Sequence, residues 1–575
     1  MTERGGEALL TALSLEEAWR HLHWLEQNAP TRISGTPDQV RAGEYFAEQL
    51  DGLGLETHLD TFTGYRSFPG QASVTLHSPE RAFPAVACGH IESTPDEGLD
   101  LDLVFVGGGA AEDYGGLDVR GRAVLAEISK GPARPVKAHI AADHGAAAII
   151  FLTWGRPEYG TIPAGAIKCA WGNPTRDTMS DIPRIAALGI SRAAGDEVRS
   201  LLAERSVRAT VVAQASRDWG PMTQPWARLR APANETGDFL LVGGHYDAWT
   251  PGMTDNAAGN ALMLELARIF ADRAGELRRD IVFAFWNGHE IGDYEGSTWF
   301  ADRYWDDLDE NGVAYLNVDS IGFAFTDRYL AESTSELATF HKRVERRVLG
   351  VDTDHLHLAR DNEHPFFGLG LPALEGRFRF SEEQIAEWGG ARGGWWWHSP
   401  DDTIDRIDPG RFRDHARVYA AYMWELCTAP VLPFDYETYA RRLRLSVAAM
   451  RDHAGDRFDL DLPVGPFGQA AHALARAAGQ PMDEARTRRV NAALMRMSRL
   501  LLPAFETRGG RYTQDRVGHE ALSSAVPALH DLTLLAALPP DDDLAHLLHT
   551  ELLRARNRLS DALRAATAEA LSSLA

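Results

Sequence analysis

Three short apolar runs in the middle of the chain each lead directly to polar side chains. The runs cover residues 239–242, 281–286 and 313–316. Short runs that are apolar at every position are typical of strands buried on both faces of a parallel sheet. The polar side chains that follow these three runs are those of His245, Asp247, His289, Glu290 and Asp319.

A helical pattern separates the first two of these strands. It begins after Asp255, and its apolar positions are Ala261, Leu262, Leu264, Leu266, Ile269 and Phe270. Strands that alternate with amphipathic helices indicate an α/β fold with parallel strands. Because open α/β sheets place their chemistry at the carboxyl ends of parallel strands, we expect the polar side chains to meet there.

The flanking parts of the chain follow different patterns. Residues 15–53 predict two amphipathic helices, and residues 54–62 alternate as a strand does. The stretch 65–225 interrupts this order with short strand patterns and one helix over residues 136–144. From residue 431 the pattern is helical to the end of the chain, which indicates a separate helical part.

Composition limits the function classes and the number of domains. The chain has 575 residues, enough for two or three domains, and a net charge of −24, which argues against nucleic acid and anionic membrane surfaces as partners. Its three cysteines are too few for a disulfide framework. No apolar run is long enough to span a membrane, and the N-terminus lacks a signal-peptide pattern. We therefore expect a cytoplasmic protein.

The polar side chains at the strand ends form a candidate metal site. A further histidine, His398, stands in a tryptophan-rich loop before a helix-start signal. Any single Asp or Glu at a strand end is more often a cap than a ligand, but five candidates in order are harder to dismiss. Two imidazoles and three carboxylates suit a divalent ion, most plausibly zinc. The candidate ligands are His245, Asp255, Glu290, Asp319 and His398.

The chain resembles the co-catalytic zinc aminopeptidase superfamily, specifically its glutamate carboxypeptidase and transferrin receptor branch. The matching pieces are His245-Tyr-Asp247-Ala-Trp249, Asp255-Asn256, Phe285-Trp286-x-x-x-Glu290-x-Gly292, Gly296-Ser297, Asn317-Val-Asp319-Ser320 and His398-Ser-Pro-Asp-Asp-Thr403. The resemblance implies an α/β fold in which a zinc-peptidase-type mixed sheet is flanked by helices. It also implies an inserted β-rich protease-associated domain at 65–225 and a C-terminal helical domain at 431–575, the peptidase-type domain being 1–64 with 226–430.

The same resemblance assigns roles to the site residues. Asp255 would bridge two zinc ions, with His245 and Asp319 completing one site and Glu290 and His398 the other. Asp247 would orient His245 from behind and fix its tautomer. The peptide bond between Asp255 and Asn256 would be cis.

One departure from the family pattern concerns the general base. Active relatives carry two adjacent glutamates, and the first removes a proton from the metal-bound water. Here that position is His289, and one extra residue precedes Gly296 and brings Glu295 forward as an alternative ligand or base. A histidine can act as a base near neutral pH, since its ordinary pKa is about 6.5. The change equally suits altered or lost activity.

The resemblance also suggests substrate contacts and a partner. Trp397 stands where glutamate-preferring relatives have a tyrosine, and its ring is a candidate apolar wall for the substrate, while His364 is a candidate substrate contact. In the family the C-terminal helical domain forms a homodimer interface, so we expect a homodimer.

Three functions from different classes follow. The first is a zinc-dependent hydrolase that cuts an amide bond in a peptide or a small acyl-amino compound. The second is a non-catalytic binding protein of the transferrin-receptor type. The third is a metalloenzyme of a different reaction type that uses the same ligands. Because all five ligand positions are filled, the hydrolase is preferred.

Overall fold

The computed structural model describes residues 2–358, 365–515 and 525–575. The strands are β1 (Glu56–His77), β2 (Glu80–Ala87), β3 (Leu99–Phe105), β4 (Ala123–Glu127), β5 (Ala148–Leu152), β6 (Ala186–Ile190), β7 (Arg208–Leu229), β8 (Phe239–His245), β9 (Asp280–Trp286), β10 (Gly312–Asn317), β11 (Arg328–Ser333), β12 (Asp354–His357) and β13 (Ala373–Arg379). The helices before the C-terminal part are α1 (Thr2–Ala12), α2 (Leu15–Asn28), α3 (Pro37–Gly52), α4 (Arg134–Asp143), α5 (Arg192–Glu204), α6 (Ala258–Ala271), α7 (Glu295–Arg303), α8 (Trp305–Asn311), α9 (Ala338–Leu349), α10 (Glu382–Glu387) and α11 (Pro409–Thr428).

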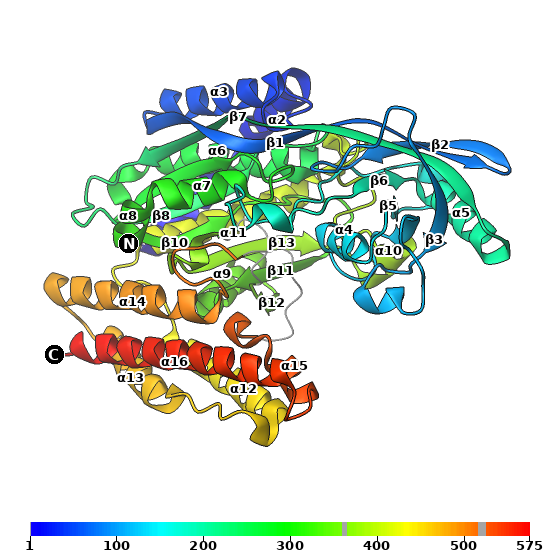
Figure 1. The fold of residues 1–575 in the computed structure, drawn as a ribbon. Helices are drawn as coiled ribbons and strands as arrows, with labels where there is room; N and C mark the ends of the chain where they lie inside the picture. The colour runs from blue at the N-terminus through cyan, green and yellow to red at the C-terminus, as the bar shows by residue number, and fades with distance from the viewer. Residues whose placement is uncertain (1, 359–364, 516–524) are drawn as a thin grey trace.

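The strands form one mixed sheet, as Figure 1 shows. At its centre β9, β8, β10 and β13 lie side by side and parallel, while β7 and β11 pair antiparallel to the flanks of this group. The three apolar runs at 239–242, 281–286 and 313–316 lie in β8, β9 and β10. The prediction of a mixed α/β fold with these buried strands is therefore confirmed.

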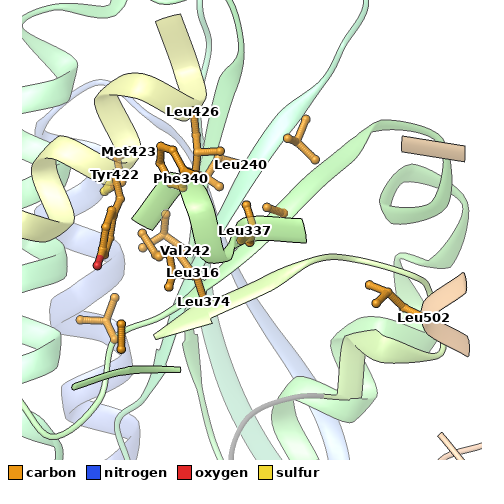
Figure 2. Close-up of a cluster of buried hydrophobic side chains, with 14 of the residues drawn as sticks. Leu240, Val242, Leu316, Leu337, Phe340, Leu374, Tyr422, Met423, Leu426 and Leu502 are labelled. Carbon is orange, nitrogen blue, oxygen red and sulfur yellow. The ribbon is translucent and has the colours of Figure 1, made fainter. Parts of the chain in front are cut away.

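Alternate residues of β8 face two different hydrophobic clusters. Leu240 and Val242 belong to a cluster with residues of α6, α9 and α11, part of which Figure 2 shows. Phe239 and Leu241 pack on the other face, against residues of α7 and α8 such as Phe300. Because side chains alternate across a strand, helices on both faces require apolar residues at every position. This explains the continuous apolar run.

The segment 65–225 is joined to the rest by two long paired strands. β1 and β7 are antiparallel, with Thr63 opposite Pro221 and Gly64 opposite Gly220. The expected boundaries after residues 64 and 225 thus fall inside strands rather than in loops. The far part of this segment has its own hydrophobic cluster, built from residues 74–213. Figure 1 shows β1 and β7 running together from the central sheet to this part.

The C-terminal part that the structure describes is helical. Its helices are α12 (Tyr436–Ala454), α13 (Val464–Ala478), α14 (Glu484–Phe505), α15 (Leu532–Ala537) and α16 (Asp543–Ser572). They gather in a bundle beside the sheet, with α14 nearest to it (Figure 1). Across the described ranges, none of the helices combines the length and apolar character that crossing a membrane requires.

Candidate metal centre

The candidate site lies at the carboxyl ends of three neighbouring parallel strands. His245 is the last residue of β8, His289 and Glu290 follow β9, and Asp319 follows β10. Since β8 pairs in parallel with both β9 and β10, these ends meet at one edge of the sheet. The fold thus brings together residues that are far apart in the sequence.

Two groups of potential ligand atoms share the Asp255 carboxylate. In the first, Nε2 of His245 lies 2.9 Å from Oδ1 of Asp255 and 3.6 Å from Oδ1 of Asp319. In the second, Nε2 of His398 lies 3.2 Å from Oδ2 of Asp255 and 3.0 Å from Oε2 of Glu290. Within each group the ligand atoms lie within 4.8 Å of one another. Asp255 therefore presents one oxygen to each group.

The turn that carries Asp255 is held by buried polar groups. The peptide bond between Asp255 and Asn256 is cis, as the resemblance implies. The Asp402 carboxylate accepts hydrogen bonds from the backbone N–H of Thr254 (3.0 Å) and of Asp255 (3.3 Å). The buried Arg32 guanidinium donates to the carbonyl of Pro251 (3.0 Å). These contacts hold the turn and thereby the position of the Asp255 carboxylate.

Asp402 and Arg32 were not among the predicted site residues. Asp402 stands within the His398-Ser-Pro-Asp-Asp-Thr403 motif, so its position near the site was available from the sequence. For Arg32 no sequence signal exists, because the site carbonyls that it contacts, those of Tyr246 and Pro251, lie more than 200 positions away along the chain.

Asp247 is fully buried and holds the turn after β9. Its Oδ1 accepts the backbone N–H of His289 at 3.1 Å, and its Oδ2 accepts that of Glu290 at 3.0 Å. The closest contact between Asp247 and His245 joins the Asp247 carbonyl oxygen to Nδ1 of His245, at 3.1 Å. The carboxylate Oδ1 of Asp247 lies 3.7 Å from the same nitrogen. Asp247 is thus placed to orient the imidazole with its backbone and the turn with its side chain.

His289 lies directly beside the first ligand group. Its ring stacks on the ring of His245, with centroids 3.8 Å apart and planes 9° apart. Tyr294 packs edge-on against its other side, with centroids 5.0 Å apart. The half-buried imidazole is therefore held at the site without being part of either ligand group.

The electrostatics of the two histidines reflect the surrounding carboxylates. Burial opposes a charged imidazole, yet the nearby carboxylates of Asp247, Asp255 and Asp319 raise the pKa of His245 well above its ordinary value. For His398, burial is likewise outweighed by Glu290 and Asp255, which raise the pKa to about 9. Burial disfavours the charged Asp255 carboxylate, but the two histidines hold its pKa well below the ordinary value. The carboxylates of the site thus favour positive charge on the groups beside them.

The remaining predicted residues lie differently. Glu295 is completely buried and belongs to neither ligand group; burial raises its pKa to about 8, against the opposing charge of Lys168. The Trp397 indole N–H donates to Oδ2 of Asp255, and its ring stacks on Trp154 with centroids 5.5 Å apart. His364 lies outside the described residues.

The segment that carries the site is similar to a known protein family. The sequence pattern of Peptidase family M28 matches residues 227–423, which include all five candidate ligands. The "Probable glutamate carboxypeptidase VP8" of Zea mays is 24% identical over 510 residues, covering 74% of this chain and 69% of that protein. The "Inactive zinc metalloprotease C354.09c" of Schizosaccharomyces pombe is 26% identical over 219 residues, 35% of this chain and 27% of that protein.

Solved structures support the same fold. The structure described as "Peptidase M28 precursor" from Shewanella amazonensis SB2B matches with a TM-score of 0.61 and 19% identity, covering 75% of this chain and 98% of that one. The fold of this chain is therefore similar to that of Peptidase M28 structures, and residues 227–423 are similar in sequence to that family. The replacement of a catalytic glutamate by His289, the inserted domain type and the homodimer stay predictions.

Proposed function

We propose that this chain is a zinc-dependent hydrolase that cleaves an amide bond in a peptide or a small acyl-amino compound. The observation that carries the proposal is the pair of ligand groups joined through Asp255. The similarity to Peptidase family M28 over the same residues supports it.

The side chains of the two groups fit a pair of zinc ions. Each group combines one imidazole with two carboxylates, donors that zinc accepts, and leaves room for a non-protein ligand. In two-metal hydrolytic sites the two ions lie about 3.5–4 Å apart, a separation that a carboxylate shared by both would allow. His245, Asp319 and Asp255 would hold one ion, and Glu290, His398 and Asp255 the other. When bound, zinc would supply Lewis acidity toward water and the scissile carbonyl.

The chain's own side chains would then position the reacting groups and transfer a proton. His289 would take a proton from the attacking water on an imidazole nitrogen and return it to the leaving amine. The stacking on His245 and the Asp247 hydrogen bond to its backbone fix where that ring stands. The Trp397 and Trp154 rings would form an apolar wall that keeps bulk water from the reacting bond.

Two further proposals concern the parts around the peptidase-type segment. We propose that residues 65–225 form a protease-associated type of domain, and that α12–α16 pair two chains into a homodimer. The separate hydrophobic cluster built from residues 74–213 supports the proposal of an inserted domain. Exposed leucines on the C-terminal helices support the second.

A second candidate function is a non-catalytic, metal-binding protein of the same fold. Two points favour it. By the resemblance, His289 would take the position of the base in active relatives, and one of the similar proteins bears the name of an inactive metalloprotease. Under this alternative the ligand groups would still bind zinc, but no amide would be cleaved.

A substrate screen with zinc-loaded and zinc-free protein separates the two candidates. Aminoacyl amides, dipeptides and N-acyl amino acids would be offered at near-neutral pH, with product amines detected. Cleavage that disappears on chelation and returns with added zinc supports the hydrolase. Tight zinc binding without any cleavage across the screen supports the non-catalytic protein.

A further inference from the structure

A buried lysine of the segment between β5 and β6 reaches the turn that follows β9. Lys168 is 1% exposed. Its Nζ donates to the carbonyl oxygens of Ala170 (2.8 Å) and Gly172 (2.5 Å) in its own segment, and to the carbonyl oxygen of Gly292. Gly292 stands two positions after Glu290 and three after His289. Lys168 therefore links the 65–225 segment to the turn that carries two candidate site residues.

The ammonium group of Lys168 is saturated by these contacts. Lysine has three N–H donors, and three carbonyl oxygens receive them. An ammonium buried without partners costs several kcal/mol, so the three acceptors are needed to keep it in place. The Glu295 carboxyl group lies 3.8 Å from Nζ, beyond hydrogen-bond distance. Burial lowers the pKa of Lys168, while Glu295 and Asp293 oppose this shift.

The turn that Lys168 contacts needs outside support. Asp293 and Tyr294 both have left-handed backbone conformations, with φ of 52° and 71°. Non-glycine residues adopt this region at an energetic cost and persist there only when neighbouring structure fixes them. A second hydrogen bond joins the same two segments, from the N–H of Gly172 to the carbonyl oxygen of Asp293 (2.7 Å).

We propose that Lys168 is a positioning residue that holds the turn after β9, so that His289 stays on the ring of His245 and Glu290 faces His398. The proposal rests on the proposed function for its catalytic consequence, but its structural part concerns the turn alone. Asp247 anchors the start of this turn through the N–H groups of His289 and Glu290. Lys168 anchors its far end at Gly292, so the two candidate residues lie between two fixed points.

The test compares Lys168→Met and Lys168→Gln with Lys130→Met. Methionine and glutamine are each one bond shorter than lysine and carry no charge; methionine removes every donor, whereas glutamine keeps two donors. Lys130 is a matched control because it lies in the same 65–225 segment, is 64% exposed and pairs with Glu127 at 3.0 Å. If Lys168→Met fails to fold, Lys168→Gln provides the measurement.

Three readouts separate positioning from a merely structural role. Amide hydrogen exchange should quicken in the peptide that covers residues 288–296 and stay unchanged elsewhere in the chain. Zinc affinity and turnover should each fall by about 10–100-fold, with KM changed little, since groups that orient ligands have effects of this size. Lys168→Gln should give smaller changes of the same kind, and Lys130→Met none.

Two results would overturn the proposal. One is unchanged exchange at 288–296 with full zinc affinity in both Lys168 variants. The other is exchange that quickens evenly along the whole chain, which would make Lys168 a general stabilising residue. If the parent protein cleaves no amide, the proposed function fails, but exchange and zinc affinity still decide the role of Lys168.

Discussion

The imidazole ring of His289 lies flat against that of His245, with ring centroids 3.8 Å apart. One of these rings is a candidate zinc ligand, and the other is the proposed general base. The stack places the proposed base directly beside the first ligand group, of which it is not a member.

Replacing His289 by alanine should reduce turnover without removing metal. Loss of a general base costs about 10²–10⁴-fold in rate. Because His289 belongs to neither ligand group, zinc content should stay at the parental value. His289→Glu should retain or raise activity, since it restores the pair of glutamates. The exposed His472, on α13, is the control: His472→Ala should change neither quantity. Parental turnover in His289→Ala would place the base elsewhere.

The metal-free protein should lose stability as the pH rises through the alkaline range. The pKa of His398 is raised from 6.5 to about 9 in the folded chain. Its protonated form therefore contributes stability that is fully present below pH 6.5 and is lost as pH rises to about 9. Thermal unfolding of chelated protein across this range measures the effect. His398→Gln should flatten the profile; an unchanged slope in that variant would contradict the assignment.

Replacing Glu295 by glutamine should stabilise the protein most at alkaline pH. Burial raises the pKa of this carboxyl from 4.5 to about 8, against the charge of Lys168. A raised carboxyl pKa gives stability that is lost as pH rises from 4.5 to about 8, because the unfolded chain releases its proton first. The Glu295→Gln variant lacks this loss, so its melting temperature should exceed the parent's at pH 8 more than at pH 5. An equal difference at both values would mean that Glu295 is ionised throughout.

Exposed leucines on the C-terminal helices offer a test of the homodimer. Leu547 of α16 is 62% exposed, and Leu445 of α12 is 68% exposed. An interface of at least roughly 1,200 Å² in total should bury such side chains. Light scattering at micromolar concentration should give twice the mass of one chain. Leu547→Asp should shift this toward the monomer, while Leu117→Asp, in the 65–225 segment, should not. A monomeric parent would rule out the dimer at that concentration.

The strands and the candidate residues at their ends could be predicted because their signal is local. The apolar runs of β8, β9 and β10 are each followed within a few positions by polar residues of the site. The division of the ligands into two groups came from the resemblance. The position of Glu295 could not be predicted in this way. The left-handed residues Asp293 and Tyr294 precede it, and its side chain lies buried beside Lys168. Contacts over long sequence separations decide that outcome, as they do for Arg32.

The boundaries of the 65–225 segment show a second limit of sequence patterns. A change of pattern near residue 65 suggests a boundary, but β1, which is 22 residues long, continues through it because β7 pairs with it. Strand pairing over such a distance leaves no mark in a local window of sequence.

The central claim is that Asp255 joins two zinc ions. Diffraction from zinc-loaded crystals above and below the zinc absorption edge tests it directly. The account predicts two anomalous peaks about 3.5–4 Å apart, one on each side of the Asp255 carboxylate, and neither peak in Asp255→Ala. Asp456, an exposed aspartate in the C-terminal part, serves as the control, and Asp456→Ala should keep both peaks. A single peak, or full zinc retention in Asp255→Ala, would contradict the account.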